Sequence, residues 1–278
     1  MRLGQSLWCP LVIAMCGTES AWAAPASGSV RLAPHRVVYE LSLVSSRSVK
    51  GIEAARGRIA FEMTGNACNG YTLRYRQLMV VEGSETGSKV TDVRTANFES
   101  ADGRTFRFRN DVKLAGSHPQ IVDGQAERRG NSRTTVTLRS PKRQTVPLGP
   151  DVVFPNAQMR DIITAARDGQ TSVAIRLFDG SDDGRKLYET LAIIGKRVEG
   201  VEAPEPATRQ AGLQGLARWP VTLSYFDRGR EDQTASYILS FDLYENGVSR
   251  ALRLDYGDFA LKGEMTRLDL LSEGSCSR

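Results

Sequence analysis

One acidic segment, Asp179–Gly184, has residue types that could bind a divalent cation. It reads DGSDDG, so its first, third and fifth residues carry the side-chain oxygens that calcium prefers, and its last glycine permits a sharp turn. The twelfth position of a helix-flanked calcium loop needs a bidentate glutamate, but here it is Thr190, with Glu189 one place early. Because the flanking residues alternate as strands do, we expect an acidic hairpin loop and no metal site.

Two further carboxylates, Asp255 and Asp258, lie close together in the sequence. Such a pair could divide the acid and base roles of a glycoside hydrolase. An aspartate at the turn after an exposed strand explains the same pattern. No G-x-S-x-G stretch provides an esterase nucleophile, and no G-x-x-x-x-G-K-[ST] loop would bind phosphate. We therefore expect no catalytic residue and keep a cell-wall hydrolase only as a third alternative.

Histidine chemistry is equally limited. The sequence has only His35 and His118, and neither has another ligand type at metal-binding spacing. We expect no zinc site and no cofactor.

Basic residues are concentrated in the middle of the chain. They are Arg104, Arg107, Arg109, Arg128, Arg129, Arg133, Arg139, Lys142 and Arg143. Phe106 and Phe108 alternate with two of these arginines, which could indicate an aromatic platform for nucleic acid. In a strand, however, neighbouring residues point to opposite faces, so the two side-chain types would not share a surface. We expect a solvated sheet face or a basic outer rim that contacts anionic glycolipid or cell-wall polymer, and no nucleic acid.

Strands must position most of these residues, because apolar and polar residues alternate along much of the chain. The C-terminal stretch 218–271 predicts an antiparallel meander, in which Asn246-Gly247 is a strong hairpin signal. The same alternation predicts earlier strands at 37–43, 59–63, 71–76, 90–98 and 104–114. The more polar segments 121–128 and 134–139 are expected to be edge strands protected by charge. At least eight short strands with frequent turn signals indicate a barrel or a curled sheet.

Three segments depart from this alternation. From Gln77 the phase slips into a continuous apolar run, which a bulge or a strand buried on both faces would explain. Residues 199–214 contain two prolines and no periodicity, and are expected to be a linker or a mobile loop.

The third segment is helical. Asn156 is expected to be the N-cap, and Gly169 to stop the helix. Its apolar residues are Met159, Ile162, Ile163 and Ala166, which form one stripe. The helix should therefore lie on the concave side of the sheet or plug one end of it.

The N-terminus indicates export. Arg2, the apolar run from Leu7 to Cys16, and Ala21-Trp22-Ala23 together form the pattern of a cleavable signal peptide. We predict cleavage after Ala23, a mature chain of residues 24–278 and a periplasmic location. No later segment reaches the apolar length of a membrane span.

Cleavage leaves two cysteines, Cys68 and Cys276. In an oxidising compartment they admit one intramolecular disulfide, whereas two buried free thiols are the alternative. A disulfide would tie the last strand to an early hairpin, so we expect one domain over residues 24–278. The 40% hydrophobic content is enough for a core, and the net charge of +5 suits an anionic partner but also serves solubility.

Several stretches together resemble the cell envelope integrity EipB family of Gram-negative periplasmic proteins. They are LAPHRVVYELSL at 32–43, FPNAQMR at 154–160, FDGSDDGRKLY at 178–188 and LDYGDF at 254–259, together with the cysteine pair. The resemblance covers essentially the whole mature chain. It implies a curled β-sheet, described as a β-spiral, closed by a Cys68–Cys276 disulfide. It also implies a role in envelope maintenance and brings no catalytic residues.

These patterns predict an all-β protein with a strongly curled antiparallel, open barrel-like sheet, one or two short helices packed on it, and one disulfide. We expect a monomeric, non-enzymatic periplasmic protein that binds a protein partner or an anionic envelope component. A lipid or lipoprotein carrier with an apolar cavity is the second functional alternative.

Overall fold

The computed structural model describes residues 29–47, 51–84, 87–130, 133–200, 205–227 and 234–276. The predicted signal peptide, residues 1–23, lies outside this part of the chain. In the described residues, β-strands form a single 15-stranded sheet. The first eight strands are β1 (His35–Ser46), β2 (Ile52–Asn66), β3 (Gly70–Gly83), β4 (Gly87–Glu99), β5 (Thr105–Leu114), β6 (Gln120–Arg129), β7 (Arg133–Ser140) and β8 (Gln144–Gly149). The others are β9 (Val152–Val153), β10 (Ser172–Leu177), β11 (Tyr188–Ile194), β12 (Arg218–Asp227), β13 (Tyr237–Tyr244), β14 (Ser249–Asp255) and β15 (Phe259–Leu270).

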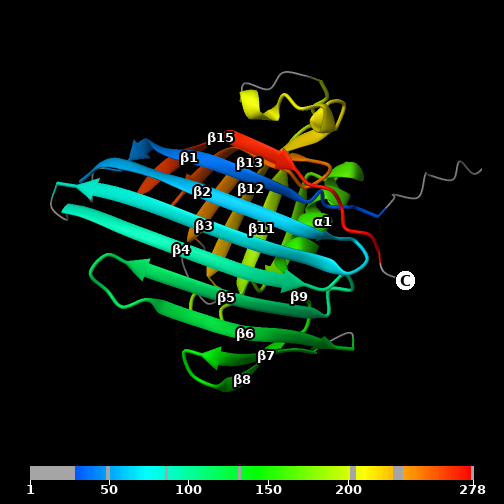
Figure 1. Ribbon diagram of the computed structural model, residues 1–278, viewed down its shortest axis with the longest axis horizontal. Helices are drawn as coiled ribbons and strands as arrows, with labels where there is room; N and C mark the ends of the chain where they lie inside the picture. Colours follow the sequence, from blue (N-terminus) through cyan, green and yellow to red (C-terminus); the bar gives the residue numbers. More distant parts are fainter. Residues whose placement is uncertain are drawn as a thin grey trace, which may run out of the picture.

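The two ends of the described chain meet in the middle of this sheet. The strand order runs β8 to β1, then β15 to β9, so β1 pairs with β2 on one side and β15 on the other. All pairs are antiparallel except β9 with β10. Strands β8 and β9 are the edges, and only Pro150 and Asp151 separate them in the sequence, so the sheet must curl back on itself. Figure 1 shows the layer of β1–β8 in front of the remaining strands. The predicted all-β, barrel-like fold is confirmed.

Period-two alternation decides which side chains face inward. In β1, Val37, Tyr39 and Leu41 are 2–4% exposed, whereas Arg36 points outward and is exposed. The inward side chains of β1–β3 and of β10–β15 pack together in one large apolar cluster. A second, smaller cluster contains four phenylalanines, and they are Phe106, Phe108, Phe154 and Phe178. The same continuous sheet therefore supplies both clusters.

The helix α1 (Pro155–Arg167) fills one end of the curled sheet (Figure 1). Ile162 and Ile163 are fully buried and belong to the large cluster, as the apolar stripe predicts. The predicted N-cap is wrong, because Phe154 is the N-cap, Pro155 is the first helical residue and Asn156 is buried.

A carboxylate from another element caps this helix. Glu99 in β4 is 1% exposed and accepts hydrogen bonds from the backbone N–H groups of Asn156 (2.7 Å) and Ala157 (2.9 Å). A helix N-terminus carries unpaired N–H groups and a partial positive charge, so a carboxylate there replaces the missing side-chain cap.

The segment expected to be a linker packs against the sheet instead. The Glu205 side chain is buried and accepts hydrogen bonds from the backbone N–H groups of Met265 (2.7 Å) and Ala251 (3.2 Å), while Leu213 is 4% exposed. These contacts connect residues that are distant in the sequence, so the lack of periodicity in residues 199–214 does not predict them. Residues 201–204 lie outside the described part of the chain.

Two strand predictions are also wrong. Gln77 causes neither a bulge nor burial on both faces, because the β2–β3 and β3–β4 registers run through it without a shift and Leu78 is 40% exposed. Gln77 simply takes an inward position, where its amide donates a 3.1 Å hydrogen bond to the Tyr256 hydroxyl. The segments expected to be edges, β6 and β7, are interior strands, and the edge next to them is the unpredicted β8.

A disulfide joins Cys68, in the β2–β3 turn, to Cys276, beyond β15, with their Cα atoms 5.7 Å apart. Figure 1 shows the C-terminal segment beside that turn. The Asn66 side chain strengthens the junction by donating a 2.9 Å hydrogen bond to the Gly274 carbonyl.

Candidate functional site

The acidic loop Asp179–Gly184 folds through its own hydrogen bonds. Asp179 accepts one from the Ser181 N–H (2.9 Å), and Asp183 accepts one from the Arg185 N–H (2.9 Å) while its carboxylate pairs with the Arg185 guanidinium. Burial raises the pKa of Asp179. Within the described ranges, no cluster of three or more His, Cys, Asp or Glu side chains could hold a metal ion. The loop is a turn whose charges are already engaged.

Asp255 is the last residue of β14, and Asp258 lies in the turn just before β15. Asp255 accepts a hydrogen bond from the Gly257 N–H (2.9 Å), and the Asp258 backbone carbonyl accepts one from the Arg47 N–H (2.8 Å). Both contacts hold the turn between β14 and β15 in place. This geometry favours the interpretation of an aspartate at a strand end.

Neither of the two histidines belongs to a group of potential metal ligands among the described residues. His35 is 2% exposed, and its ring lies against Phe61 with centroids 5.1 Å apart. Burial lowers the pKa of His35. His118 is exposed in the loop between β5 and β6.

The arginines and phenylalanines of β5 do point in opposite directions. Phe106 and Phe108 are 1–2% exposed in the small aromatic cluster. On the outer face, the Arg107 guanidinium lies 4.8 Å from the centre of the Phe98 ring, and Arg109 pairs with Asp123 at 3.3 Å. The phenylalanines are therefore not available as a stacking platform.

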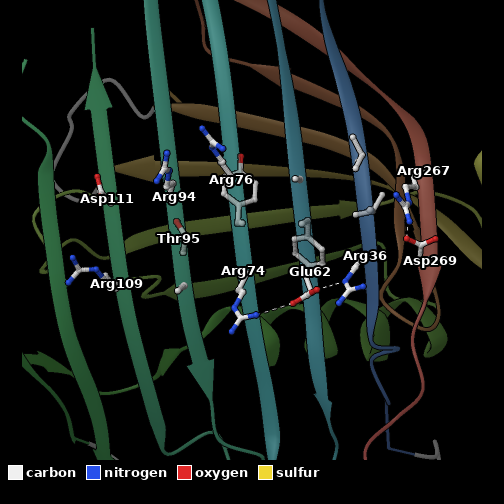
Figure 2. Close-up of a pocket in the computed structure, with 16 residues that line it drawn as sticks. Arg36, Glu62, Arg74, Arg76, Arg94, Thr95, Arg109, Asp111, Arg267 and Asp269 are labelled. Carbon is white, nitrogen blue, oxygen red and sulfur yellow. Dashed lines mark hydrogen bonds and ion pairs between the residues drawn. The ribbon is translucent and has the colours of Figure 1, made fainter. Parts of the chain in front are cut away.

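The outer face carries a groove of about 760 Å³ that crosses β15 and β1–β5 (Figure 2). Six arginines and three carboxylates line it, and Asp92 and Asp123 beside the lining pair with three of these arginines. Six arginines therefore face five carboxylates, and one positive charge is in excess. The arginines are Arg36, Arg74, Arg76, Arg94, Arg109 and Arg267, and the carboxylates are Glu62, Asp111 and Asp269. We call this hollow the arginine groove. Each of its arginine side chains is 52–74% exposed, so the guanidinium groups are accessible to a ligand.

Strand register brings these arginines together. One row across the sheet pairs Arg36 with Glu62, Glu62 with Arg74, Arg74 with Ala96, and Ala96 with Arg109. Side chains of directly paired residues lie on the same face, about 5 Å apart. Arg36 and Arg109, which lie 73 positions apart in the sequence, thus come to the same row on the same face.

A second row runs beside the first and contains smaller side chains. It places Arg267, Val38, Ala60, Arg76 and Arg94 on successive strands. Val38, Ala60 and Ala96 leave the space between the long arginine side chains that forms the hollow.

Carboxylates are shared between arginines, so pairing does not neutralise the face. Glu62 contacts both Arg36 and Arg74, and the hydrogen bond from Arg36 is the main cause of the lowered pKa of Glu62. Figure 2 shows the Glu62 carboxylate between these two guanidinium groups. Each such triad keeps one net positive charge.

Asp92 holds the second triad. Its carboxylate lies 2.9 Å from Arg76 and 2.9 Å from Arg94. The hydrogen bond from Arg76 is the largest favourable contribution that lowers the pKa of Asp92 to about 2. Because Arg76 and Arg94 are directly opposite one another, their charges would otherwise repel. A third triad follows around Asp123, which pairs with Arg109 and Arg139.

Comparison with known proteins identifies the family. The model of the family described as EipB-like matches residues 26–272. The chain belongs to the EipB-like family. It is 36% identical over 256 residues to the cell envelope integrity protein EipB of Brucella abortus (strain 2308), with 91% of this chain and 90% of that protein covered.

A solved structure gives the same result for the fold. The crystal structure of a beta-barrel-like protein of a domain of unknown function from Brucella abortus superposes with a TM-score of 0.80 at 35% identity. The match covers 87% of this chain and 100% of the other. This EipB-like chain has, in its described part, no helix both long and apolar enough to cross a membrane.

Sequence reasoning found only part of the arginine groove. The basic middle of the chain includes Arg109, but the other five arginines of the groove lie outside it. The available signal was the alternation of arginines with inward apolar residues, as in β3. Grouping them required the register between strands, which the alternation alone does not give.

Proposed function

We propose that this protein maintains cell envelope integrity in the periplasm by binding an anionic envelope component in the arginine groove. The role is supported by the name of the Brucella abortus relative, and the location by the predicted signal peptide. The binding mode is supported by the excess of positive charge in an open groove. Binding without catalysis agrees with the placement of Asp255 and Asp258 in a turn.

The shared carboxylates are the observation that carries this proposal. An arginine that pairs with its own carboxylate is satisfied, whereas two arginines around one carboxylate retain hydrogen-bond donors and charge for a further anion. Exposed guanidinium groups bind carboxylate and phosphate in a bidentate manner. A protein partner would therefore have to present an acidic surface to use the same groove.

The lipid-carrier alternative receives less support. Such a carrier needs an apolar hollow inside the curled sheet. Ile162 and Ile163 of α1 are fully buried, and Met159 packs against the same cluster, so this end of the interior is filled by the protein itself.

The test is complementation with a charge-reversed groove. A strain that lacks the gene receives either the wild-type protein or the double variant Arg76→Glu/Arg94→Glu, and survival in a membrane-perturbing detergent is counted. Accumulation of the double variant is measured by immunoblot, because two added carboxylates repel Asp92. A double variant that accumulates should fail to restore resistance. Arg253→Glu is the matched control, because Arg253 is an exposed arginine of β14 that does not line the groove. Full complementation by the double variant would contradict the proposal.

A further inference from the structure

The outer face of β3 and β4 is amphipathic next to the arginine groove. Along β3, Arg76 is followed two and four residues later by Leu78 and Val80, which therefore point to the same face. Val80 is paired with Val90 of β4, and the register has no shift between this pair and Arg76–Arg94. Leu78, Val80 and Val90 thus form an aliphatic strip beside the arginines.

The strip is accessible and bordered by further charged side chains. Leu78 is 40% exposed. On β2, Arg58 is paired with Leu78 and Arg56 with Val80, and both arginine side chains remain about two-thirds exposed at 64% and 66%. On β4, Leu78 is paired with Asp92, and Arg58 and Arg56 form ion pairs with Glu40 and Glu82. The aliphatic side chains are therefore bordered by guanidinium groups and carboxylates on a single face.

We propose that this face docks onto the anionic phospholipid surface of a membrane, with the arginines at the phosphate groups and the aliphatic strip at the acyl boundary. This inference rests on the proposed function and names the anionic component. Charge complementarity favours this occupant, since each arginine near an anionic leaflet adds to the affinity. The exposed Leu78 favours a membrane over a soluble polyanion. An apolar side chain stabilises binding only where it leaves water, which it can do at the acyl boundary of a membrane but not against a dissolved polyanion.

The like-charged pair is the expected headgroup site. Arg76 and Arg94 lie opposite each other on neighbouring strands, with only Asp92 between them. Strands lie about 4.8 Å apart, so the two guanidinium groups are close enough to share one phosphate. A phosphate bound there supplies the second negative charge that this triad lacks.

The test is co-sedimentation of the full mature chain with vesicles of phosphatidylglycerol and phosphatidylcholine, compared with phosphatidylcholine alone. We expect binding to the anionic vesicles only, which weakens as salt is raised because exposed charges are screened. Arg76→Gln/Arg94→Gln should weaken binding about 30-fold, from about 1 kcal/mol per arginine. Arg253→Gln, the matched control, should bind as the wild type does.

Leu78 separates a membrane surface from a dissolved polyanion. Leu78→Ser should weaken vesicle binding about fivefold without changing its salt dependence. Ile193→Ser, which alters a 48% exposed aliphatic side chain of β11, should have no effect. Soluble polyphosphate is the second probe. If it binds in an Arg76- and Arg94-dependent manner while anionic vesicles do not, the membrane inference is overturned and the proposed function stands. If neither probe binds, both are overturned.

Discussion

Asp92 determines how much of the positive charge of the arginine groove is available. It is the only carboxylate that contacts both Arg76 and Arg94 among the described interactions, and its side chain is 16% exposed. It therefore acts as an internal competitor for any anion that approaches these two arginines. Removing the charge of Asp92 should therefore have opposite effects on two quantities: the affinity for an anion rises, and the stability of the folded protein falls.

Asp92→Asn should tighten binding to anionic vesicles about fivefold, because the negative charge that contacts Arg76 and Arg94 is removed. The same change should lower the melting temperature slightly, since Arg76 and Arg94 then repel each other across the strand pair. Co-sedimentation and thermal melting measure the two effects. Asp102→Asn, in the β4–β5 turn outside the groove lining, is the control and should leave the affinity unchanged. Weaker binding by Asp92→Asn would show that the triad positions the arginines and does not compete with the ligand.

The pH dependence of stability follows from the same carboxylate. The pKa of Asp92 is lowered from 3.8 to about 2 in the folded protein, so folding favours the ionised form. Its contribution to the free energy of unfolding is present above pH 4 and is lost as the pH falls towards 2. The wild type should therefore be more stable than Asp92→Asn at pH 5, and the two should melt together only below about pH 2, where Asp92 is protonated in the folded protein as well. A gap that stays constant over this range would contradict the lowered pKa.

The acidic loop Asp179–Gly184 is a packing element of the small aromatic cluster. At Gly180, with φ of 72°, a Cβ atom would lie 2.4 Å from the Phe108 ring. At Gly184 a Cβ atom would lie 2.6 Å from Val122. Gly184, which would be the sharp turn of a calcium loop, is thus required by close contact with β6, and Gly180 by close contact with β5.

Gly180→Ala should be strongly destabilising. The positive φ costs about 1 kcal/mol, and the collision with Phe108 adds about 1–3 kcal/mol of overpacking. Gly257→Ala is the matched control, because Gly257 has a φ of 85° and open space where the Cβ atom would lie. The free energies of unfolding of both variants are measured in urea, and their difference gives the cost of the collision with Phe108. Equal losses in the two variants would mean that the loop does not press on the aromatic cluster.

The helix α1 is expected to contribute mainly through its buried stripe. Ile163→Ala should cost about 2–5 kcal/mol, the usual range for a large buried aliphatic side chain. Ile193→Ala removes the same atoms from a 48% exposed position and should cost less than about 0.5 kcal/mol. Chemical denaturation compares them directly. A small loss at Ile163 would indicate a loosely packed interior and would revive the carrier alternative.

Local sequence patterns predict the strands and the helix well where one face is buried. Alternation correctly separates Phe106 and Phe108 from Arg107 and Arg109, because burial on one face imposes period two. It fails at Gln77, since an inward polar residue that finds a hydroxyl partner breaks the apolar pattern without altering the strand. The prediction of a linker around Glu205 is wrong for a similar reason, because the Glu205 side chain accepts hydrogen bonds from strands that are distant in the sequence.

The arginine groove depends on long-range pairing, which explains why the sequence indicates it only in part. Arg36 and Arg267 lie on paired strands near opposite ends of the chain. No local pattern connects them, and a shift of one residue would send either side chain to the other face. The basic residues in the middle of the chain therefore predict an outer surface but do not predict a groove.

The closure of the sheet by Cys68 and Cys276 links the beginning and end of the fold, which are 208 residues apart in sequence. We propose that residues 24–278 form one domain, because a single sheet supplies both apolar clusters. Calorimetry should then show one cooperative transition, whereas two separated transitions would contradict the single domain.

Cys276→Ser should lower the free energy of unfolding by about 2–5 kcal/mol, since the unfolded chain is no longer constrained. Cys68→Ser should have the same effect, and the double variant should be no worse than either single variant because all three lose the same bond. An unchanged melting temperature in non-reducing buffer would contradict this prediction. Additive losses would show that the two side chains act separately.

The two faces of each strand can change independently over evolutionary time. Inward residues such as Val37 and Tyr39 maintain the fold, while their immediate neighbours Arg36 and Val38 meet the surroundings. Descendants of one ancestral scaffold could therefore exchange their exterior residues and acquire new partners while the interior stays as it was. Two such proteins could superpose closely and still attach to chemically different surfaces.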